Sequence, residues 1–569
     1  MIGTTNYFDK GGILHRQKWV LPGLLVFLSG VLFLSGLSIR SLWGSEGRWA
    51  EVAREMVRSD NYFLPTINGQ VYFDKPLLSY WVILLASFKG VVTEGSSRLP
   101  SALSGIGAVL LTFAVGRRLF GSRAGAISGM FLLTSVMYLL WSRTASAELL
   151  NLFAVWLALW IFLRNDFTNR SLAVISLYVL GAVAAFCKGL VGPAVIFSSI
   201  GFSSANEILA DLKGKDTNRH LFIESVSRRF FWILSRPGAL GILAGSAAFT
   251  GLLLAPVVFT GSWQSVELMW RENVLRFFLP FDHIEPPHIY LKYIPLFFAP
   301  WTLFLAASLL DSKRLIQTGQ FRRILMITLA VFLFYTASGS RRSYYILPIL
   351  PALAILTGGI VDGWLGNRGT SKGRAIRTAA VATSVFPLLT GAALIYAYFG
   401  LEIPRHISQL PVAALSMAGA VVSIRMFVQE RRLKGFVVLF AVVFIIEIWG
   451  VTLGMALGEK ERTLKPFSEK VNYLLRDVKD DKIAFYQVED SALIFYLNRK
   501  PLESLHNIEN LKTFMNSNPD GFIIADMSVV QGFESEILPR KPALMLVERA
   551  VSRKKDDPLA LFALSGRCD

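Results

Sequence analysis

Ionisable residues stand directly beside long apolar segments at two points of this 569-residue sequence. In "WSRTASAELLNLF", Arg143 and Glu148 separate two apolar runs, and in "AAFCKGLVGPAV", Lys188 precedes two glycines and a proline that interrupt a helical pattern. Ionisable side chains at membrane depth are costly, and they mark functional sites by default. A lysine beside a broken helix suits the binding of an anion, with a salt bridge between helices as the structural alternative.

An acid and a base also stand at the start of an apolar helix in "NGQVYFDKPLLSYW". Asp74 and Lys75 precede a proline in a favourable early helical position. The exposed amides of a helix N-terminus favour anions, so this pair suits an anionic ligand. The structural alternative is that Asp74 caps the helix and Lys75 extends to lipid headgroups.

A second polar segment, "WRENVLRFFLPFDHIEPPHIYLKY", brings acids, bases and imidazoles together. Its ionisable residues are Arg271, Glu272, Arg276, His283, Glu285, His288 and Lys292. Histidine and carboxylate side chains bind divalent metals, but the spacing matches no closed zinc motif. A divalent metal is therefore the one candidate cofactor, and it is undetermined. Asp74 and His283 are the two residues that could approach each other across the loops.

Paired arginines stand beside aromatic residues in "SGSRRSYYILPILP". This stretch contains Arg341, Arg342, Tyr344 and Tyr345. Guanidinium groups bind phosphate oxygens in a bidentate fashion and stack on aromatic rings, so this arrangement suits a phosphate carried by a lipid or a sugar.

The segment "GSEGRWAEVAREM" is amphipathic, with apolar residues at helical spacing and charged residues on the remaining faces. The simplest interpretation is a helix on the membrane surface, with its apolar face in the lipid and its charges in water. We predict that this interfacial helix anchors the loop and that its first residues, Glu46 and Arg48, face a catalytic cavity.

The elements that must position these residues are membrane spans. Hydrophobic residues make up 53% of the chain and aromatic residues 12%, and the mean hydropathy is +0.49, which excludes an ordinary soluble enzyme. A spanning helix needs about 20 mostly apolar residues, and about thirteen such windows are present. They centre on 19–39, 99–116, 124–141, 149–163, 171–187, 189–205, 238–259, 291–310, 324–338, 344–362, 378–399, 411–427 and 435–456.

The net charge of +18 could suggest a nucleic-acid partner, but the basic residues gather in alternate loops of a membrane protein. The positive-inside rule then gives one orientation, with these loops in the cytoplasm. Two long loops, 40–98 and 260–290, and the C-terminal region are then expected on the outer side of the membrane. Long outer loops are candidates for function.

Two regions follow from the change in polarity, a membrane body at 1–458 and a polar region at 459–569. In the second region, "KIAFYQV", "GFIIAD" and "ALMLVERA" are typical of strands, and "SALIFYLN" and "IENLKTFMN" of helices. We predict a small extracytoplasmic α/β domain without a nucleotide-binding fingerprint, since no glycine-rich loop follows either of the first two strands.

Six motifs in this order resemble the GT-C glycosyltransferases that use polyprenyl-phosphate sugars. They are "SEGRWAEVAREM", "YFDKP", "ASAELL", "CKGLVGP", "ENVLRF" followed by "HIEP" and "APW", and "SGSRRSYYILPILPALA". The chain is most similar to the lipid A aminoarabinose transferases and their dolichyl-phosphate-mannose relatives.

The resemblance implies a polytopic α-helical membrane protein of GT-C type, with about thirteen spans and a C-terminal α/β domain. It also implies transfer of a sugar, with inversion, from a polyprenyl (undecaprenyl) monophosphate to a lipid, lipopolysaccharide or other envelope acceptor. The location it implies is the outer, periplasmic face of the bacterial inner membrane, with membrane lipids as further partners.

The roles that the resemblance implies are assigned residue by residue. The family has an Asp-Glu pair where this chain has Ser45-Glu46, so Glu46 or Asp74 acts on the acceptor. Glu148 stands where relatives have aspartate, which makes it the third catalytic candidate. The donor phosphate is assigned to Lys75, Lys188, Arg341 and Arg276. The residue patterns described above, and not the resemblance, add Arg48, Arg143, Glu272, His283 and Tyr345 as further cavity residues.

A transporter or flippase of the same lipid-linked sugar is the main alternative. Alternating access favours ionisable residues near the bilayer midplane and internal repeats, whereas here they gather at one face and no repeat is present. A membrane scaffold would leave Glu148, Lys188 and the arginine pair unexplained, and an inactive relative is the alternative that Ser45 raises. The sugar, the acceptor, the metal requirement and the oligomeric state are undetermined by the sequence.

Overall fold

The protein is described here from a computed structural model. It describes residues 19–165, 171–212, 219–280, 282–311, 316, 318–366, 373–401, 404–457, 459, 463–488, 490–531, 542–548 and 558–564. Contacts divide the chain into two compact units. The helical unit comprises Met1–Ser35, Phe73–Ser79 and Arg98–Thr452, and the loop-domain unit comprises Gly36–Tyr72, Tyr80–Ser97 and Leu453–Asp569. The first outer loop, except for Phe73–Ser79, thus groups with the C-terminal region.

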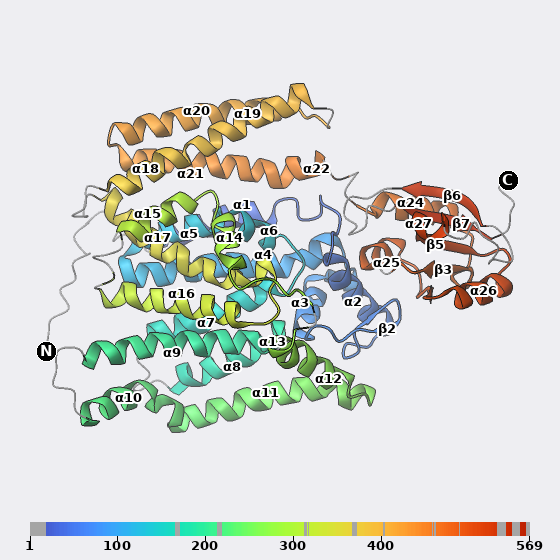
Figure 1. The fold of residues 1–569 in the computed structure, drawn as a ribbon, viewed down its shortest axis with the longest axis horizontal. Coiled ribbons are helices and arrows are strands. Elements are labelled where there is room, and N and C mark those ends of the chain that lie inside the picture. The colour runs from blue at the N-terminus through green and yellow to red at the C-terminus, as the bar shows by residue number, and fades with distance from the viewer. Residues whose placement is uncertain are drawn as a thin grey trace. The chain divides into compact units, whose positions relative to one another are not determined.

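The helical unit is a bundle of long apolar helices (Figure 1). Its first elements are α1 (Val20–Leu34), α4 (Glu94–Phe120), α5 (Ser122–Leu133), α6 (Val136–Ser142), α7 (Glu148–Arg164), α8 (Ser171–Lys188), α9 (Val191–Leu212), α10 (Arg219–Leu234) and α11 (Arg236–Thr260). The second outer loop follows with α12 (Gln264–Trp270), the π-helix η2 (Arg271–Leu275) and α13 (Arg276–Phe278). The remaining elements are α14 (Ile289–Phe297), α15 (Thr302–Asp311), α16 (Gly319–Ala337), the 3-10 helix η4 (Ser343–Ile349), α17 (Leu350–Leu365), α18 (Arg374–Thr383), α19 (Val385–Gly400), α20 (Gln409–Val428), α21 (Arg432–Trp449) and the π-helix η5 (Gly450–Gly454).

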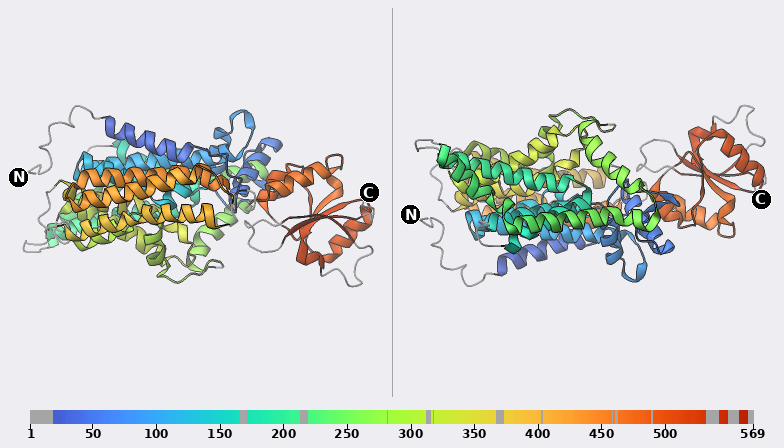
Figure 2. Two further views of the ribbon diagram at one scale, coloured as in Figure 1. Left: turned by 90° about the horizontal axis from the view of Figure 1, so that it is seen from above. Right: turned by 90° about the horizontal axis from the view of Figure 1, so that it is seen from below.

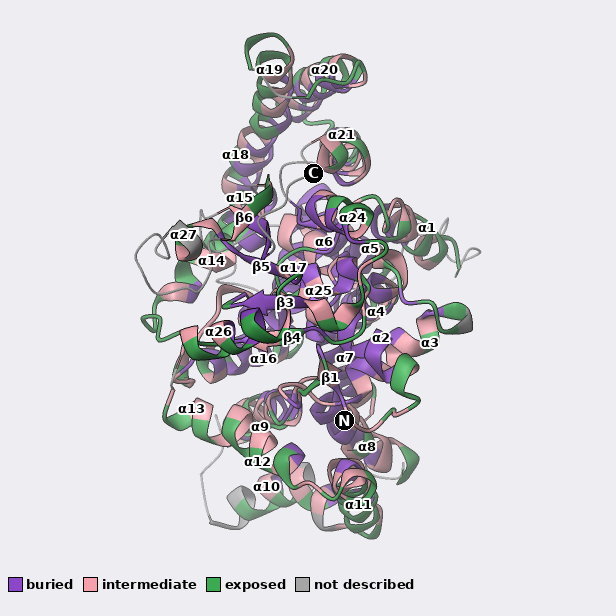
Figure 3. Cartoon of the chain, turned by 90° about the vertical axis from the view of Figure 1, so that its right-hand side faces the viewer, coloured by how far each residue is buried: buried purple, intermediate pink, exposed green. Residues whose placement is uncertain are grey.

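Small residues let the central helices approach closely. A Cβ atom on Gly358 of α17 would lie 2.2 Å from Ser128 Oγ of α5, and one on Gly125 would lie 2.6 Å from Phe113 O of α4. Such small-residue contacts are typical of helices packed in a membrane. In Figure 3, α17 is largely buried, whereas α11 and α19 show exposed surface, as expected of helices that face lipid.

Every apolar window predicted from the sequence is helical, but fewer complete spans are present than predicted. Among the described residues, eight helices are long and apolar enough to cross a membrane, or ten if two bent pairs each count as one span. The pairs α5 with α6 and α14 with α15 are bent by 70° and 111°. Three predicted windows are not among these candidate spans. The windows 19–39 and 149–163 form helices of 15 and 17 residues, α1 and α7. The window 189–205 forms α9. The prediction of about thirteen full spans is therefore not reached.

The C-terminal part of the loop-domain unit contains a five-stranded sheet of order β4-β3-β5-β7-β6. Its elements are α24 (Lys465–Leu474), β3 (Ile483–Tyr486), α25 (Ser491–Leu497), β4 (Glu503–Leu505), α26 (Ile508–Ser517), β5 (Phe522–Asp526), α27 (Met527–Gln531), β6 (Ala543–Glu548) and β7 (Leu559–Ala563). Strand β3 is parallel to β4 and β5, while β7 is antiparallel to β5 and β6. Strands β4 and β7 were missed by the sequence pattern. The run at 543–548 is an edge strand, and the last strand in the chain is β7.

Helices cover both faces of this sheet (Figure 2). Alternate residues of β3 point to opposite faces. Phe485 packs in a cluster with residues of α24 and α25, and Tyr486 packs in a second cluster with residues of α26. Because both faces are covered, β3 is buried along its whole length, and its sequence is continuously apolar rather than alternating.

The amphipathic helix predicted to lie on the membrane surface is α2 (Glu46–Ser59), and it is buried within the loop-domain unit. Its Arg54 donates to Phe495 O at 2.6 Å and to Asn498 Oδ1 at 2.7 Å, and it pairs with Glu51. The guanidinium also lies 4.6 Å from the centre of the Phe495 ring. The interfacial-anchor prediction is therefore wrong, because the apolar residues Trp49, Val52 and Met56 are buried in protein and the charged side chain of Arg54 has partners on α25 and on α2 itself.

The turn between the two short strands of the first loop is bound to α2 by a carboxylate. Glu55 accepts hydrogen bonds from the amides of Asn68 at 2.6 Å and Gly69 at 3.2 Å, in the turn between β1 (Thr66–Ile67) and β2 (Gln70–Val71). The Asn68 side chain in turn donates to Leu502 O and accepts from Leu502 N, each at 2.7 Å. The first loop and the α/β sheet are thus joined by polar contacts within one compact unit.

This buried arrangement predicts a pH dependence of α2 docking. Burial raises the pKa of Glu51 from 4.5 to about 8, although Arg54 opposes the shift. Because the folded-state pKa exceeds the unfolded one, the stability that Glu51 contributes is fully present below pH 4.5 and is lost as the pH rises through about 8. We expect amide hydrogen exchange in α2, corrected for its intrinsic rate, to accelerate from about pH 5 to about pH 9. Glu51→Gln removes this acceleration, whereas Glu509→Gln on the exposed surface of α26 preserves it. An unchanged pH profile in Glu51→Gln would contradict the assignment.

Candidate functional site

The centre of the site in the helical unit is a buried ion pair between Glu148, the first residue of α7, and Lys188, the last residue of α8. Their side chains are 9% and 11% exposed. The Lys188 ammonium lies 4.4 Å from the centre of the Tyr345 ring and 5.9 Å from that of Tyr344. One carboxylate and two aromatic rings offset part of the cost of burying the lysine ammonium in an apolar bundle.

A second ion-pair group is built on the second outer loop. Arg276 donates to Glu272 Oε2 at 2.5 Å and to Asp282 Oδ2 at 2.6 Å, and its Nε donates to Ser340 Oγ at 3.3 Å. Burial would lower the pKa of the Arg276 guanidinium, but Tyr345, Glu272 and Asp282 together hold it above its ordinary value. Arg276 is therefore a permanent positive charge that fastens the loop to the turn before η4.

The arginine pair in that turn divides into two environments. Arg341 donates to the carbonyl oxygens of Thr336 at 3.1 Å and Glu285 at 2.5 Å. Arg342 contacts the His283 ring and donates to Tyr344 Oη at 2.8 Å. Since Tyr344 also lies beside Lys188, Arg342 rather than Arg341 shares an aromatic neighbour with the buried lysine.

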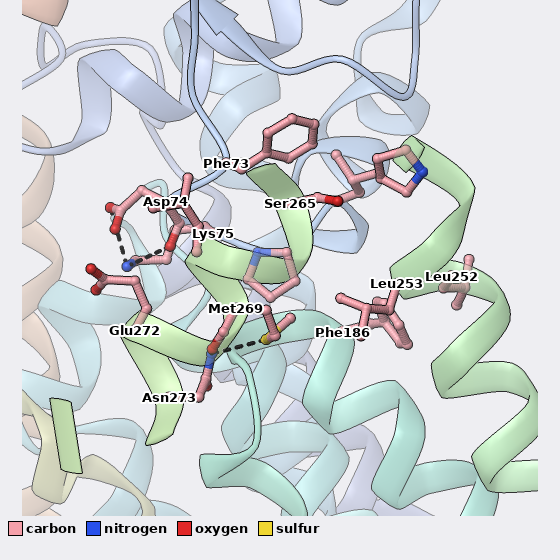
Figure 4. Close-up of a pocket in the computed structure, with 14 residues that line it drawn as sticks. Phe73, Asp74, Lys75, Phe186, Leu252, Leu253, Ser265, Met269, Glu272 and Asn273 are labelled. Carbon is pink, nitrogen blue, oxygen red and sulfur yellow. Dashed lines mark hydrogen bonds and ion pairs between the residues drawn. The ribbon is translucent and has the colours of Figure 1, made fainter. Parts of the chain in front are cut away.

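The pair Asp74 and Lys75 forms the polar end of an open pocket, whose empty volume is about 410 Å³ when the open solvent at its mouth is included. Lys75 Nζ lies 3.2 Å from Asp74 Oδ2 and 3.0 Å from Asp74 O. Figure 4 shows these two side chains and Glu272 together at one end, with Phe186 and Leu253 at the other. The pocket therefore has the polarity expected for an amphiphile, with a polar head beside Lys75 and an apolar tail at the other end. It is lined by Phe73, Asp74, Lys75, Pro76, Leu77, Phe186, Leu252, Leu253, Pro256, Ser265, Leu268, Met269, Glu272 and Asn273.

Arg143 has a different environment from the one expected of a cavity residue. Its guanidinium donates to Leu32 O at 2.8 Å, Phe33 O at 3.2 Å and Val451 O at 3.2 Å. These carbonyls belong to the end of α1 and to η5, where helical hydrogen bonding is incomplete or altered. Arg143 thus stabilises helix ends that are far apart in the sequence.

Glu46 and Arg48 belong to the loop-domain unit, whereas the other ten predicted site residues belong to the helical unit. The Glu46 carboxylate is 1% exposed and accepts hydrogen bonds from Arg40 at 2.9 Å and from the Trp43 amide at 3.1 Å. Arg48 donates to Tyr72 Oη at 3.0 Å. Their predicted roles stay predictions.

The described residues contain no group of three or more His, Cys, Asp or Glu side chains that could hold a metal ion. His283, which was considered as a ligand, has Asp282 Oδ2 at 3.3 Å from its Nε2 and contacts Arg342.

Two residues of these contacts were missed by sequence reasoning. Asp282 was overlooked although it stands beside His283 in the charged stretch, and its pairing with Arg276 was not visible from spacing. Asn273 is neutral, so no charge pattern marks it, yet its Oδ1 accepts from Leu190 N at 2.8 Å. The "ENVLRF" motif was the available signal for Asn273.

Sequence comparisons connect the chain to known glycosyltransferases. Residues 74–209 match the family model described as dolichyl-phosphate-mannose-protein mannosyltransferase. The undecaprenyl phosphate-alpha-4-amino-4-deoxy-L-arabinose arabinosyl transferase of Shewanella sediminis is 26% identical over 86% of this chain and 86% of its own length. An enzyme of the same name from Pseudomonas fluorescens is 26% identical over 67% of this chain and 64% of its own length.

Solved structures show the same fold. ArnT from Cupriavidus metallidurans bound to undecaprenyl phosphate superposes with a TM-score of 0.70 at 20% identity, over 97% of this chain and 99% of ArnT. The apo form gives a TM-score of 0.72 at 18% identity, over 96% and 98% of the two chains.

The fold and the sequence matches are those of integral-membrane glycosyltransferases of the GT-C type. Within that class, the chain has the ArnT fold and is similar in sequence to the aminoarabinose transferases.

Proposed function

We propose that this protein transfers a sugar from a polyprenyl monophosphate, of the undecaprenyl type, to a lipid acceptor of the bacterial cell envelope. The observation that carries the proposal is a concentration of paired cations beside a pocket with one polar and one apolar end. The names of the related arabinosyl transferases, and the undecaprenyl phosphate bound to ArnT, support the same donor chemistry.

The cations suit a phosphate that gains charge during the reaction. A sugar-phosphate-lipid diester carries one negative charge, and the lipid monophosphate that leaves approaches two. Lys75, Lys188 and Arg276 would therefore interact more strongly with the transition state than with the bound donor, which is electrostatic catalysis. Each of them is paired with a carboxylate, so donor binding exchanges a carboxylate partner for phosphate oxygens.

The exchange of partners also provides a base. When Lys75 or Lys188 turns to the phosphate, Asp74 or Glu148 loses its cation and becomes a better proton acceptor for a sugar or lipid hydroxyl. An acceptor that attacks through its own phosphate is already anionic and needs no base. The nature of the acceptor therefore decides whether one of these carboxylates is required.

We place the reaction at the periplasmic face of the inner membrane. Basic residues concentrate in the alternate loops on the other side, as expected for cytoplasmic loops. The second outer loop and the turn that contains Arg342 then both belong to the periplasmic side.

The test is transfer of a labelled sugar by the purified protein in lipid vesicles. The donors are synthetic undecaprenyl-phosphate sugars, including 4-amino-4-deoxy-L-arabinose, and the acceptors are total envelope lipids. We expect label to move from at least one donor to a lipid whose mass identifies the acceptor. Flipping of the donors across acceptor-free vesicles, with no transfer from any of them, would contradict the proposal and establish a transporter.

A further inference from the structure

The break between α8 and α9 is held by a residue of the second outer loop. Lys188 ends α8, Gly189 has φ of +88°, and α9 begins at Val191. A positive φ is strained for any residue with a Cβ atom and is readily adopted by glycine. Leu190 lies between the two helices, and its amide donates to Asn273 Oδ1 at 2.8 Å.

The orientation of the Asn273 amide is fixed from both sides. Its Nδ2 donates to Met269 O at 2.8 Å and lies 2.9 Å from Met269 Sδ, while its Oδ1 accepts from Leu190. A flipped amide would place two donors against each other at Leu190 and two oxygens against each other at Met269. Asn273 therefore fits this position in one orientation.

The contact also requires glycine at position 189. A Cβ atom there would lie 1.7 Å from Asn273 Oδ1 and 2.6 Å from its Cγ, far inside van der Waals contact. The side chain of Asn273 thus occupies the space that the missing Gly189 side chain leaves.

Asn273 stands between the two ion-pair groups of the site. It follows Glu272, the partner of Arg276, and through Leu190 and Gly189 it holds the residues that follow Lys188, the partner of Glu148. It also lies in the π-helix η2 (Arg271–Leu275), and π-helical turns occur often at functional sites.

We propose that Asn273 is a positioning residue that holds the end of α8 against η2, and so fixes the Lys188 ammonium relative to the Glu272–Arg276 pair. The catalytic consequence rests on the proposed function, because Lys188 matters for rate only if a phosphate leaves beside it. The contact itself is testable without that function.

The first experiment measures amide hydrogen exchange at Leu190 in the full-length protein in lipid nanodiscs. Asn273→Ala removes the acceptor, so we expect exchange to accelerate about tenfold or more. Asn273→Asp keeps an acceptor for the Leu190 amide but places its second carboxylate oxygen against Met269 O, so we expect a smaller acceleration than in Asn273→Ala. Asn165→Ala, which removes a side-chain hydrogen bond to Ile161 O at the end of α7, is the matched control and leaves Leu190 unchanged. Wild-type exchange in Asn273→Ala would overturn the inference.

The second experiment separates kcat from KM for the lipid-phosphate donor. A misplaced Lys188 loses more interaction with the dianionic leaving group than with the bound donor, so Asn273→Ala lowers kcat about tenfold and changes KM by less than about threefold. A defect that merely reduced the folded fraction would lower the amount of active enzyme, which active-site titration with undecaprenyl phosphate measures. A kcat at the wild-type value would overturn the positioning role.

A double-mutant cycle identifies the contact as the cause. Gly189→Ala introduces the clash with Asn273, so it is expected to cost less activity in the Asn273→Ala background than in the wild type. Additive effects of the two substitutions would overturn the inference. If the wild type transfers no sugar from any donor, the proposed function fails, and the exchange rate at Leu190 alone decides whether Asn273 holds the break.

Discussion

Replacing Lys188 with methionine is expected to lower kcat for sugar transfer by about 10²- to 10³-fold, the range for loss of one preorganised charge at a developing anion. Lys188 is held between Glu148, Tyr344 and Tyr345. Donor binding exchanges the Glu148 partner for phosphate oxygens, and the ammonium then needs little further reorganisation when charge develops on the leaving phosphate. The measurement is single-turnover transfer of a labelled sugar in lipid vesicles.

The same substitution also threatens the fold, and a second variant separates the two effects. Lys188→Met leaves the Glu148 carboxylate buried without its cation, which costs about 3–5 kcal/mol when one partner of a buried pair is removed. The double variant Lys188→Met with Glu148→Gln removes both charges and is expected to recover the thermal stability of the wild type. We expect it to remain inactive. Recovery of transfer in the double variant would show that the pair supports the structure and does not act on the donor.

The helical part of the fold was predictable because a chain in lipid must satisfy its backbone hydrogen bonds within each segment. Apolar windows therefore identified every candidate membrane span among the described residues, but not α10 (Arg219–Leu234). They did not identify the bends in the pairs α5 with α6 and α14 with α15, since hydropathy measures composition and not direction.

The environment of α2 was not predictable from its amphipathic pattern. An apolar face at helical spacing packs equally well on lipid or on another helix, and the partner helix α25 lies more than 400 residues further along the chain. The buried Arg54, with acceptors on Phe495 and Asn498, is the feature that decides between the two. Nothing in the local sequence distinguishes it from the exposed Arg58 or the half-buried Arg48 of the same helix.

Ionisable residues within apolar surroundings were the strongest indication of the candidate site in the sequence. Lys188 and Glu148 were both singled out on that ground, with a salt bridge between helices as the structural alternative, and the structure pairs them. The sequence does not show which of the adjacent Arg341 and Arg342 lies near Lys188. The two side chains point in different directions, and only the structure shows that Arg342 contacts Tyr344. Arg143 was selected by the same rule as Lys188, but its acceptors are carbonyls of α1 and η5, which no local pattern connects to it.

Replacing Lys75 with methionine is expected to lower kcat/KM for the donor about 100-fold while leaving thermal stability unchanged. Lys75 and Asp74 are 21% and 27% exposed, so water can solvate whichever partner remains. A pair of this kind contributes about 0–1 kcal/mol to stability, in contrast to the buried pair of Lys188. A loss of activity therefore reports on the reaction and not on folding.

Two further variants sharpen this experiment. Lys292→Met removes an exposed lysine of α14 that lies 5.8 Å from the Tyr293 ring, and it is expected to keep wild-type kcat/KM. Asp74→Asn retains the Lys75 ammonium, so it is expected to lower kcat only if the acceptor is a hydroxyl that must lose a proton. Wild-type activity in Lys75→Met would mean that Lys188 and Arg276 hold the donor phosphate without it. The pocket whose polar end contains Lys75 would then be the better candidate for the acceptor lipid, because its polar and apolar ends match an amphiphile.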